Sequence, residues 1–197
     1  MRLVGARRSR TRWRPIGSGG GRVVETCEGF ADRRDAIIAL FVRSFGATEG
    51  PTIGDLVAAL MAAEGDDAPT VLRIEDVDAP IAAVFLTPVR FGNDAGRAAL
   101  LSPVGVDPAR HGEGIGTRLV ARALRLMAER GAELVMTYGD PAFYGRTGFV
   151  PVTTGVVPAP FPLTQPQGWQ AWTADGSVTP RAGPVRCVPA FERPELW

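Results

Sequence analysis

The hydrophobic and polar positions of the chain follow two periods, and each period predicts one kind of element. Apolar residues three and four positions apart predict helices, and short apolar runs bounded by glycine, proline or aspartate predict strands. Helices are expected over residues 32–46, 52–64, 114–130 and 140–148, and strands over 22–26, 70–76, 80–90, 98–106, 133–138 and 169–173. This order of strands and helices predicts an α/β fold of the α+β kind.

Residues that favour helix ends stand at the borders of these segments. Asp32 and Thr52 are placed to act as N-caps, and Gly46 is placed to end the first helix. Asp140 precedes Pro141, which predicts an N-cap followed by a proline at the first helical position, where the missing N–H costs nothing. We therefore expect two separate helices before the first long strand and a short helix after residue 140.

The stretch from Val104 to Thr117 joins an apolar strand to a long amphipathic helix through a glycine-rich turn. Gly112, Gly114 and Gly116 leave room where phosphates would approach, and they permit positive φ, so that backbone N–H groups can converge. The helix that follows adds unpaired N–H groups and the positive end of its dipole. The turn is thus expected to bind a pyrophosphate, although such a turn can also be only a tight connection.

Other phosphate and hydrolase motifs do not fit. All 22 basic residues are arginine, which excludes a P-loop with its lysine. A dinucleotide fingerprint would need glycine or alanine at position 119 when counted from Gly114, or at position 117 when counted from Gly112. The chain has Leu119 and Thr117 there, so the fingerprint does not fit. His111 could form a triad with Ser102 and Asp107, but no Gly-x-Ser-x-Gly occurs, and the histidine lies in the phosphate turn, where it would be a donor.

Two motifs carry a resemblance to a known family. The pattern Val104-x-Val106-x-Pro108, followed by His111-x-x-Gly114-x-Gly116 and a helix, resembles the acetyl-CoA-binding motif of the GNAT superfamily of N-acetyltransferases. Some thirty residues later, the stretch 139–149, with Tyr144-Gly-Arg-x-Gly-Phe149, resembles the second signature of its YhbS-like bacterial branch. The resemblance implies a mixed, mostly antiparallel sheet with helices on both faces. It also implies transfer of an acetyl group from acetyl-CoA to an amine by direct attack in a ternary complex.

The resemblance assigns roles to residues. The strand around Val104 to Val106, where Pro103 and Gly105 would interrupt sheet pairing, is expected to bind pantetheine and to polarise the thioester oxygen. Tyr144 is expected to give a proton to the leaving thiolate, and the alternative is that it only packs beside Phe143. The expected cofactor-binding residues are Val104, Gly105, Val106, His111, Gly112, Glu113, Gly114, Ile115, Gly116, Thr117, Asp140, Phe143 and Arg146.

The turn departs from the family at two positions, and the general base stays open. His111 stands where the family usually has glutamine or arginine, and Glu113 stands where it often has a basic residue. A carboxylate beside a pyrophosphate weakens binding unless it points to solvent. The backbone donors remain, so we expect acetyl-CoA to bind, with reduced affinity. The base could be a water relay or one of Glu75, Asp76, Ser102 and Glu133.

The 197 residues, 45% of them hydrophobic, suffice for one well-packed domain with extensions. We expect an N-acetyltransferase domain over 22–155 and a proline-rich C-terminal extension over 156–197 that packs on it with a final strand. Residues 1–22 hold seven arginines and no acid, whereas the rest has 15 arginines against 21 acids. Residues 1–21 are expected to be a disordered extension, with a nucleic-acid-binding arm as the alternative, and no function is assigned to them.

The remaining composition narrows the partners. Cys27, Cys187 and a single histidine make no metal-ligand spacing, so no metal site is expected. Buried thiols and the lack of a membrane-length apolar run predict a soluble, cytoplasmic protein. The acidic body favours a cationic small-molecule amine as acceptor ahead of a peptide or protein amine. A homodimer is compatible with the sequence, nucleic acid and membranes are not expected partners, and the competing function is a GNAT-fold module that binds CoA or a protein without turnover.

Overall fold

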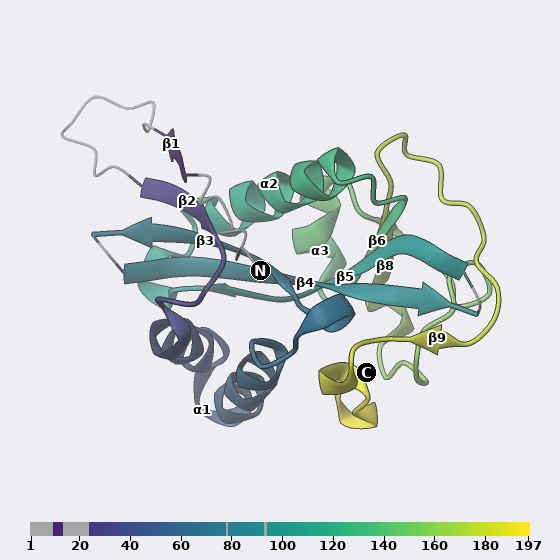
Figure 1. The fold of residues 1–197 in the computed structure, drawn as a ribbon, viewed down its shortest axis with the longest axis horizontal. Helices are drawn as coiled ribbons and strands as arrows, with labels where there is room; N and C mark the ends of the chain where they lie inside the picture. The colour runs from purple at the N-terminus through teal and green to yellow at the C-terminus, as the bar shows by residue number, and fades with distance from the viewer. Residues whose placement is uncertain (1–9, 14–23, 78, 93) are drawn as a thin grey trace, which may run out of the picture.

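A mixed sheet forms the centre of the molecule (Figure 1). The computed structural model describes residues 10–13, 24–77, 79–92 and 94–197. Within these residues the strand order is β1-β2-β3-β4-β5-β6-β8-β7, and β9 pairs with β4. All neighbours are antiparallel except β5 and β6, which are parallel, so the expected mixed, mostly antiparallel sheet is confirmed. The strands are β1 (Arg10–Trp13), β2 (Val24–Glu28), β3 (Thr70–Asp76), β4 (Ala79–Phe91), β5 (Asp94–Val106), β6 (Leu134–Tyr138), β7 (Val150–Pro151), β8 (Trp169–Trp172) and β9 (Val185–Arg186).

Helices cover both faces of this sheet, as expected. Helix α1 (Arg34–Leu60) lies on one face, and α2 (Ile115–Glu129) and α3 (Pro141–Tyr144) lie on the other (Figure 1). The buried apolar residues form two clusters, one with Phe41 of α1 and one with Leu119 of α2. Because β4 is covered on both faces, its apolar run is nearly continuous instead of alternating with polar residues.

Helix α1 consists of two helical arms that meet at a kink. Gly46 has φ 71° and ψ −170°, which confirms the predicted break at this residue. The arms pack closely, because a Cβ at Gly50 would overlap Val42 O and one at Gly54 would lie 2.8 Å from Val42 Cγ2. Glycine at these two positions therefore lets the second arm fold back against the first.

The predicted N-caps of α1 are wrong. The N-cap position is Arg33, without a side-chain cap, and the Asp32 carboxylate instead accepts a hydrogen bond from Arg73 Nη2 at 3.3 Å. The second arm begins directly after Gly46, so Thr52 lies inside it. An ion pair with a distant strand has thus replaced a local cap.

The predicted borders of α2 and the predicted start of α3 are confirmed, whereas α3 ends at Tyr144 and a 3-10 turn continues to the predicted end at Gly148. Helix α2 has Gly114 at its N-cap, ends at Glu129 and is followed by Gly131, and both glycines have positive φ. At α3 the Asp140 carboxylate accepts a hydrogen bond from Ala142 N at 2.8 Å, and Pro141 is the first helical residue. The glycines and the Asp140–Pro141 pair were therefore enough to locate these helix borders from the sequence.

Strands β5 and β6 separate before β5 ends. Their pairing runs from Ala98 with Leu134 to Leu100 with Met136, and the Thr137 hydroxyl then donates to Leu101 O at 2.9 Å. On its other side β5 stays paired with β4 as far as Val106. The expected interruption of pairing is thus found on both sides: the β4–β5 register shifts between Leu101 and Val104, and pairing with β6 stops after Leu100, which leaves a wedge-shaped opening on the β6 side.

The two ends of the chain extend the sheet and the α1 face. In the segment expected to be a disordered extension, residues 10–13 form β1, which pairs with β2, and residues 1–9 and 14–21 lie outside the described residues. In the segment 156–197, β8 pairs with β6, and Phe191 and Trp197 are buried against the α1-side cluster. Two-residue strands β7 and β9 were not predicted. The C-terminal segment contributes to the core beneath the β5–β6 opening.

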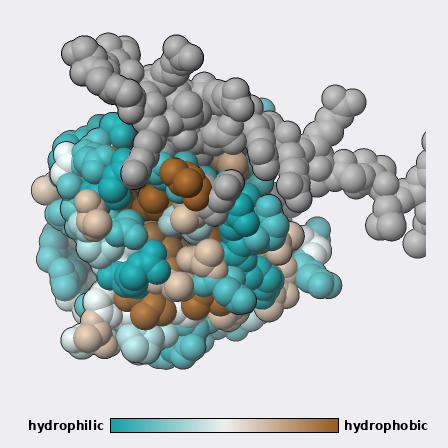
Figure 2. Space-filling view, turned by 90° about the vertical axis from the view of Figure 1, so that its left-hand side faces the viewer, coloured by the Kyte–Doolittle hydropathy of each residue, from teal (hydrophilic) through white to brown (hydrophobic). Residues whose placement is uncertain are grey.

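One end of the sheet combines polar and apolar surface. The pairing of Ala82 with Val106 places the end of β5 beside the turn between β3 and β4. Figure 2 views this end of the molecule and shows apolar side chains gathered among hydrophilic ones.

Among the described helices, none is both long enough and apolar enough to cross a membrane. Cys27 and Cys187 are buried and form no disulfide, and burial raises the pKa of Cys187 to about 12, which confirms the expectation of buried thiols.

Candidate active site

The open end of β5 directs backbone groups into the wedge between β5 and β6. Asp107 N donates to Ile81 O of β4 at 2.8 Å. Because bonding alternates along an antiparallel strand, Gly105 faces β4, and the backbone groups of Val104 and Val106 face the opposite edge. This edge can accept an extended ligand as an additional strand.

Two side chains fix the end of this edge. Val106 O accepts hydrogen bonds from Ser44 Oγ at 2.7 Å and from His111 Nε2 at 3.0 Å. His111 therefore ties the glycine-rich turn to the end of β5. Its expected role as a phosphate donor stays a prediction, and in this arrangement Nδ1 is the ring nitrogen without a bond to Val106.

A cavity of about 400 Å³, which we call the turn cavity, lies against the glycine-rich turn. Arg110, His111 and Arg146 are its basic side chains, and no acidic side chain of the described residues lines it. The cavity is therefore suited to an anion. Its lining residues are Val106, Arg110, His111, Gly112, Gly114, Ile115, Gly116, Thr117, Phe143 and Arg146.

The three glycines of the turn serve two different purposes. Gly112 and Gly114 have φ of 82° and 70°, where other residues would be strained, as predicted. The expectation of positive φ is wrong for Gly116, which lies in the first turn of α2. A Cβ there would lie 3.2 Å from both Phe143 and Val106 Cγ2, so this glycine permits close packing of α2 against α3 and β5.

The start of α2 offers unpaired backbone donors to the turn cavity. Gly114 has no side chain to cap the helix, and the first intrahelical bond is Arg118 N to Gly114 O at 3.1 Å. The N–H groups of Ile115, Gly116 and Thr117 thus have no intrahelical acceptor, and all three residues line the cavity. Together with the helix dipole they favour a bound phosphate.

Glu113 turns away from the turn cavity. Its carboxylate accepts from Arg110 Nε at 2.7 Å and from Arg110 Nη2 at 2.9 Å, and it is absent from the described lining. The hydrogen bonds from Arg110 hold the pKa of Glu113 below its ordinary value. Arg110 was not predicted to be a site residue, although an arginine three residues before an acid is a usable signal for an ion pair.

A second cavity of about 560 Å³, which we call the wedge cavity, occupies the opening between β5 and β6. Val104 lines the wedge cavity and Val106 lines the turn cavity, so the open end of β5 runs between the two. Four separate segments form its wall. Its lining residues are Phe45, Thr48, Glu49, Thr52, Ile53 and Leu56 of α1, Ser102, Pro103 and Val104 of β5, Tyr138, Gly139, Asp140 and Tyr144, and Phe191, Glu195 and Leu196 near the C-terminus.

Tyr144 reaches the wedge cavity from α3. Its side chain is buried, with ring contacts to Phe143 at 4.9 Å and to Phe149 at 5.5 Å between centroids. Burial raises the pKa of Tyr144 above its ordinary value, although a hydrogen bond with the Thr137 side chain opposes this. A Cβ at Gly139 would come within 2.8 Å of the tyrosine ring. Both expectations for Tyr144, aromatic packing and a hydroxyl next to the opening, are compatible with this geometry.

Tyr138, the other tyrosine at the wedge cavity, has its hydroxyl engaged. Its oxygen lies 3.0 Å from Thr164 Oγ1 and accepts from Gln165 N at 2.7 Å, and its ring stacks on Trp197. A proton donor must have its hydroxyl available to the reacting atoms. The Tyr144 hydroxyl has the Thr137 side chain as a partner, so hydroxyl availability alone does not separate the two tyrosines.

The wedge cavity carries negative charge. Asp140 caps α3, and Glu195 accepts from Arg193 Nε at 2.9 Å, whereas Glu49 has no hydrogen-bond or ion-pair partner among the described residues. No basic side chain of the described residues lines this cavity. Its charge is thus opposite to that of the turn cavity.

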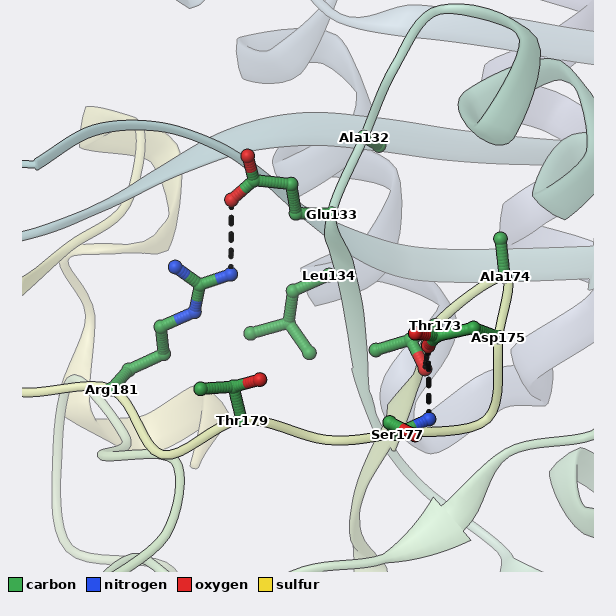
Figure 3. A pocket seen from close by; sticks show the side chains of 9 residues that line it. All are labelled: Ala132, Glu133, Leu134, Thr173, Ala174, Asp175, Ser177, Thr179 and Arg181. Atoms are coloured by element: carbon green, nitrogen blue, oxygen red, sulfur yellow. Dashed lines mark hydrogen bonds and ion pairs between the residues drawn. The ribbon is translucent and has the colours of Figure 1, made fainter.

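Three of the four candidate bases lie outside the wedge cavity. Burial alone would raise the pKa of Glu75, but hydrogen bonds from Arg73 and Arg33 lower it below its ordinary value. Asp76 accepts from Arg110 Nη1 at 2.8 Å. Glu133 accepts from Arg181 Nη2 at 3.2 Å in a separate cavity at the start of β6 (Figure 3). Ser102 is the candidate that lines the wedge cavity.

The predicted cofactor-binding residues fall into three groups. Val106, His111, Gly112, Gly114, Ile115, Gly116, Thr117, Phe143 and Arg146 line the turn cavity, and Val104 and Asp140 line the wedge cavity. Gly105 instead packs against Phe41, and Glu113 binds Arg110. The described residues contain no group of three histidine, cysteine or acidic side chains that could hold a metal ion.

Comparison with known proteins identifies the family. Residues 31–152 match the acetyltransferase (GNAT) domain. The uncharacterized N-acetyltransferase YjhQ of Escherichia coli strain K12 is 26% identical over 164 residues, which cover 80% of this chain and 89% of YjhQ. The uncharacterized N-acetyltransferase YhbS of the same strain is 33% identical over 79 residues, 40% of this chain and 47% of YhbS.

Solved structures share the fold over most of the chain. A GNAT family acetyltransferase from Brucella melitensis in complex with acetyl-CoA has a TM-score of 0.69 and 26% identity, covering 86% of this chain and 98% of that one. YhbS from Escherichia coli in complex with CoA has a TM-score of 0.71 and 25% identity, covering 87% and 93%. Since the matched domain spans more than half of the chain and includes both the turn and α3, the chain belongs to the GNAT family of acetyltransferases.

Proposed function

We propose that this N-acetyltransferase transfers the acetyl group of acetyl-CoA to the amine of a small cationic molecule that enters through the wedge cavity. The observation that carries the proposal is the pair of oppositely charged cavities on the two sides of the open end of β5. The basic cavity suits the phosphates of the cofactor, and the acidic cavity suits an ammonium group.

The described residues fit acetyl-CoA along the whole of the turn and strand. Three unpaired N–H groups of α2 and three basic side chains line the turn cavity, where the pyrophosphate would bind. The backbone edge of Val104 to Val106 would hold pantetheine as an added strand. The Brucella melitensis and YhbS structures hold acetyl-CoA and CoA, which supports acetyl-CoA as the ligand of this chain.

Besides binding of the cofactor, the reaction needs a polarised thioester, a proton for the leaving thiolate and a base for the amine, and groups at the opening can supply them. Backbone N–H groups on the edge at Val104 to Val106 would polarise the thioester oxygen, which makes its carbon a better target for the amine. Tyr144, held protonated by its raised pKa, would give its proton to the sulfur as the carbon–sulfur bond breaks. Ser102 is too weakly basic to take a proton from an amine, so we assign that task to solvent in the wedge cavity.

The shape and charge of the wedge cavity support a small acceptor. Its volume of about 560 Å³ lies within the range of small-molecule sites, and its apolar wall includes Phe45, Ile53 and Leu196. Glu49, Asp140 and Glu195 would attract a positive charge. Cysteines that are not joined in a disulfide suit a reducing compartment, and we propose the cytoplasm.

A screen for thiol release tests this function. Purified protein is given acetyl-CoA with small amines, amino acids or peptides, and the free thiol of CoA is measured. We expect release with small cationic amines. If CoA thiol is released with peptides alone, the acceptor is a peptide amine instead of a small molecule. If acetyl-CoA binds in calorimetry but no amine causes thiol release, the protein is a CoA-binding module without turnover.

A further inference from the structure

We infer that Arg110 is the side chain that binds the phosphates of acetyl-CoA in the turn cavity, and that Asp76 positions it. The inference rests on the proposed function of this cavity. Neither Arg110 nor Asp76 occupies one of the named positions of the GNAT motifs in the sequence.

The guanidinium of Arg110 is held on two sides. Nε and Nη2 donate to the two oxygens of Glu113 at 2.7 Å and 2.9 Å, and Nη1 donates to Asp76 Oδ2 at 2.8 Å. A guanidinium has five N–H donors. These bonds use three of them and leave one N–H on each terminal nitrogen for a further acceptor such as a phosphate oxygen.

Of the three residues in this ion-pair cluster, Arg110 is the one next to the turn cavity. Arg110 lines that cavity, and neither Asp76 nor Glu113 does so among the described residues. Both carboxylates therefore stand outside the cavity lining. A phosphate could bind the two remaining N–H groups without displacing either carboxylate.

The bond to Asp76 makes the position of Arg110 rigid. Asp76 is the last residue of β3, and its side chain is only 6% exposed, against 28% for Arg110. A buried carboxylate on a central strand has few alternative rotamers, so it restrains the long arginine side chain before a ligand arrives. Less conformational entropy is then lost on binding, which increases affinity.

The other two basic side chains of the turn cavity are bonded to backbone carbonyls. His111 uses Nε2 to bind Val106 O, and Arg146 uses Nε to bind Ala142 O at 2.9 Å while its guanidinium lies over the Phe143 ring. Arg110 is instead held by two carboxylates, with an unused N–H on each terminal nitrogen and a pKa raised by the bond to Glu113. It is thus the basic side chain of this cavity whose position is fixed by ion pairs before a ligand binds.

The test compares ligands with and without phosphates. We would measure acetyl-CoA binding by calorimetry for the unaltered protein, for Arg110→Gln and for Arg125→Gln, a matched loss of charge on the exposed face of α2. S-acetylpantetheine, which has no phosphate, would serve as an alternative acetyl donor. We expect Arg110→Gln to weaken acetyl-CoA binding by roughly tenfold or more, because a charge-assisted pair is lost. We expect no change in kcat/KM for S-acetylpantetheine and no effect of Arg125→Gln.

Asp76→Asn tests the positioning role. We expect weaker acetyl-CoA binding with unchanged kcat at saturating acetyl-CoA, and a double variant that binds no worse than Arg110→Gln alone. Additive losses would show that Asp76 does not act through Arg110. Equal binding by the unaltered protein and Arg110→Gln would overturn the role of Arg110, whereas failure of the unaltered protein to bind acetyl-CoA would overturn the proposed function itself.

Discussion

The turn cavity and the wedge cavity lie on the two sides of one strand end but are built differently. The turn cavity comes from a nearly continuous stretch, residues 106–117, with two side chains from the segment after β6. The wedge cavity needs α1, β5, the junction of β6 with α3, and the C-terminal segment. One is lined by basic side chains and the other by acidic ones, so the open end of β5 separates a basic cavity from an acidic one.

This difference implies that the two cavities can change independently. The turn cavity relies mainly on backbone N–H groups and on glycine conformations, which tolerate few substitutions. The wedge cavity relies on side chains that project from four segments, so its selectivity can be altered without disturbing the turn. Variants on each side of β5 should therefore have separable effects on acetyl-CoA and on the acceptor.

The largest effect is expected in the wedge cavity, at Tyr144. Tyr144→Phe keeps the ring and its packing but removes the proton donor, and general-acid catalysis is typically worth about 10²–10⁴-fold. We expect kcat to fall by at least about tenfold, with acetyl-CoA binding unchanged in calorimetry. Because the pKa of Tyr144 is raised above 10.0, its hydroxyl is protonated at neutral pH, and the deficit should shrink as acid solvent protonates the thiolate instead.

A different result would reassign Tyr144. Full kcat together with poor acetyl-CoA binding would make it a packing residue of the cofactor site. The proton donor would then have to be ordered water or Tyr138, whose hydroxyl would first have to leave Thr164 and Gln165.

The next effect concerns the strand shared by both cavities. A Cβ at Gly105 would lie 2.9 Å from the buried Phe41 ring of α1. Gly105→Ala should therefore lower the free energy of unfolding by about 1–3 kcal/mol, measured by urea denaturation, because the core is overpacked. Gly145→Ala is the control, since a Cβ there meets nothing within 4 Å, and it should be neutral or slightly stabilising. Unchanged stability of Gly105→Ala would mean that Phe41 and α1 shift at no cost.

A smaller effect should be confined to the wedge cavity. Glu49→Gln removes one exposed acid from its wall and should raise KM for a cationic acceptor by about two- to fivefold, as for other exposed ion pairs. Acetyl-CoA binding should not change. Glu64→Gln, an exposed acid outside the cavity lining, serves as the control. Equal effects of both substitutions would attribute the change to net charge instead of the cavity.

The smallest effect is expected beside the turn cavity. Glu113→Gln removes the negative charge next to Arg110, and we expect acetyl-CoA to bind about two- to threefold more tightly at low salt, with the difference decreasing as salt screens it. Because Arg110 lowers the pKa of Glu113 below 4.5, mild acidification leaves Glu113 charged and should not reproduce the effect. Glu129→Gln, at the far end of α2, is the control. Weaker binding of Glu113→Gln would show that Glu113 helps to orient Arg110.

The sequence alone determined the parts of the molecule that depend on neighbouring residues. The period of α2, the cap at Asp140 and the apolar runs of β3 to β6 predicted these elements because their signals are local. The turn cavity could be predicted for the same reason, since nearly all of its residues follow one another along the chain. The resemblance to a family then supplied the role of Tyr144.

Only the tertiary structure decided which distant residues meet. Asp32 does not act as the predicted N-cap because Arg73, 41 residues away, binds its carboxylate. Arg110 became a candidate phosphate-binding residue because Asp76, 34 residues away, accepts a hydrogen bond from its guanidinium. The wedge cavity exists because β6 leaves β5 after Leu100 and because α1 and the C-terminal residues close the opening. Such contacts leave no pattern in the local sequence, because they form between side chains that only the tertiary fold brings together. They can therefore replace the interactions that the neighbouring residues favour.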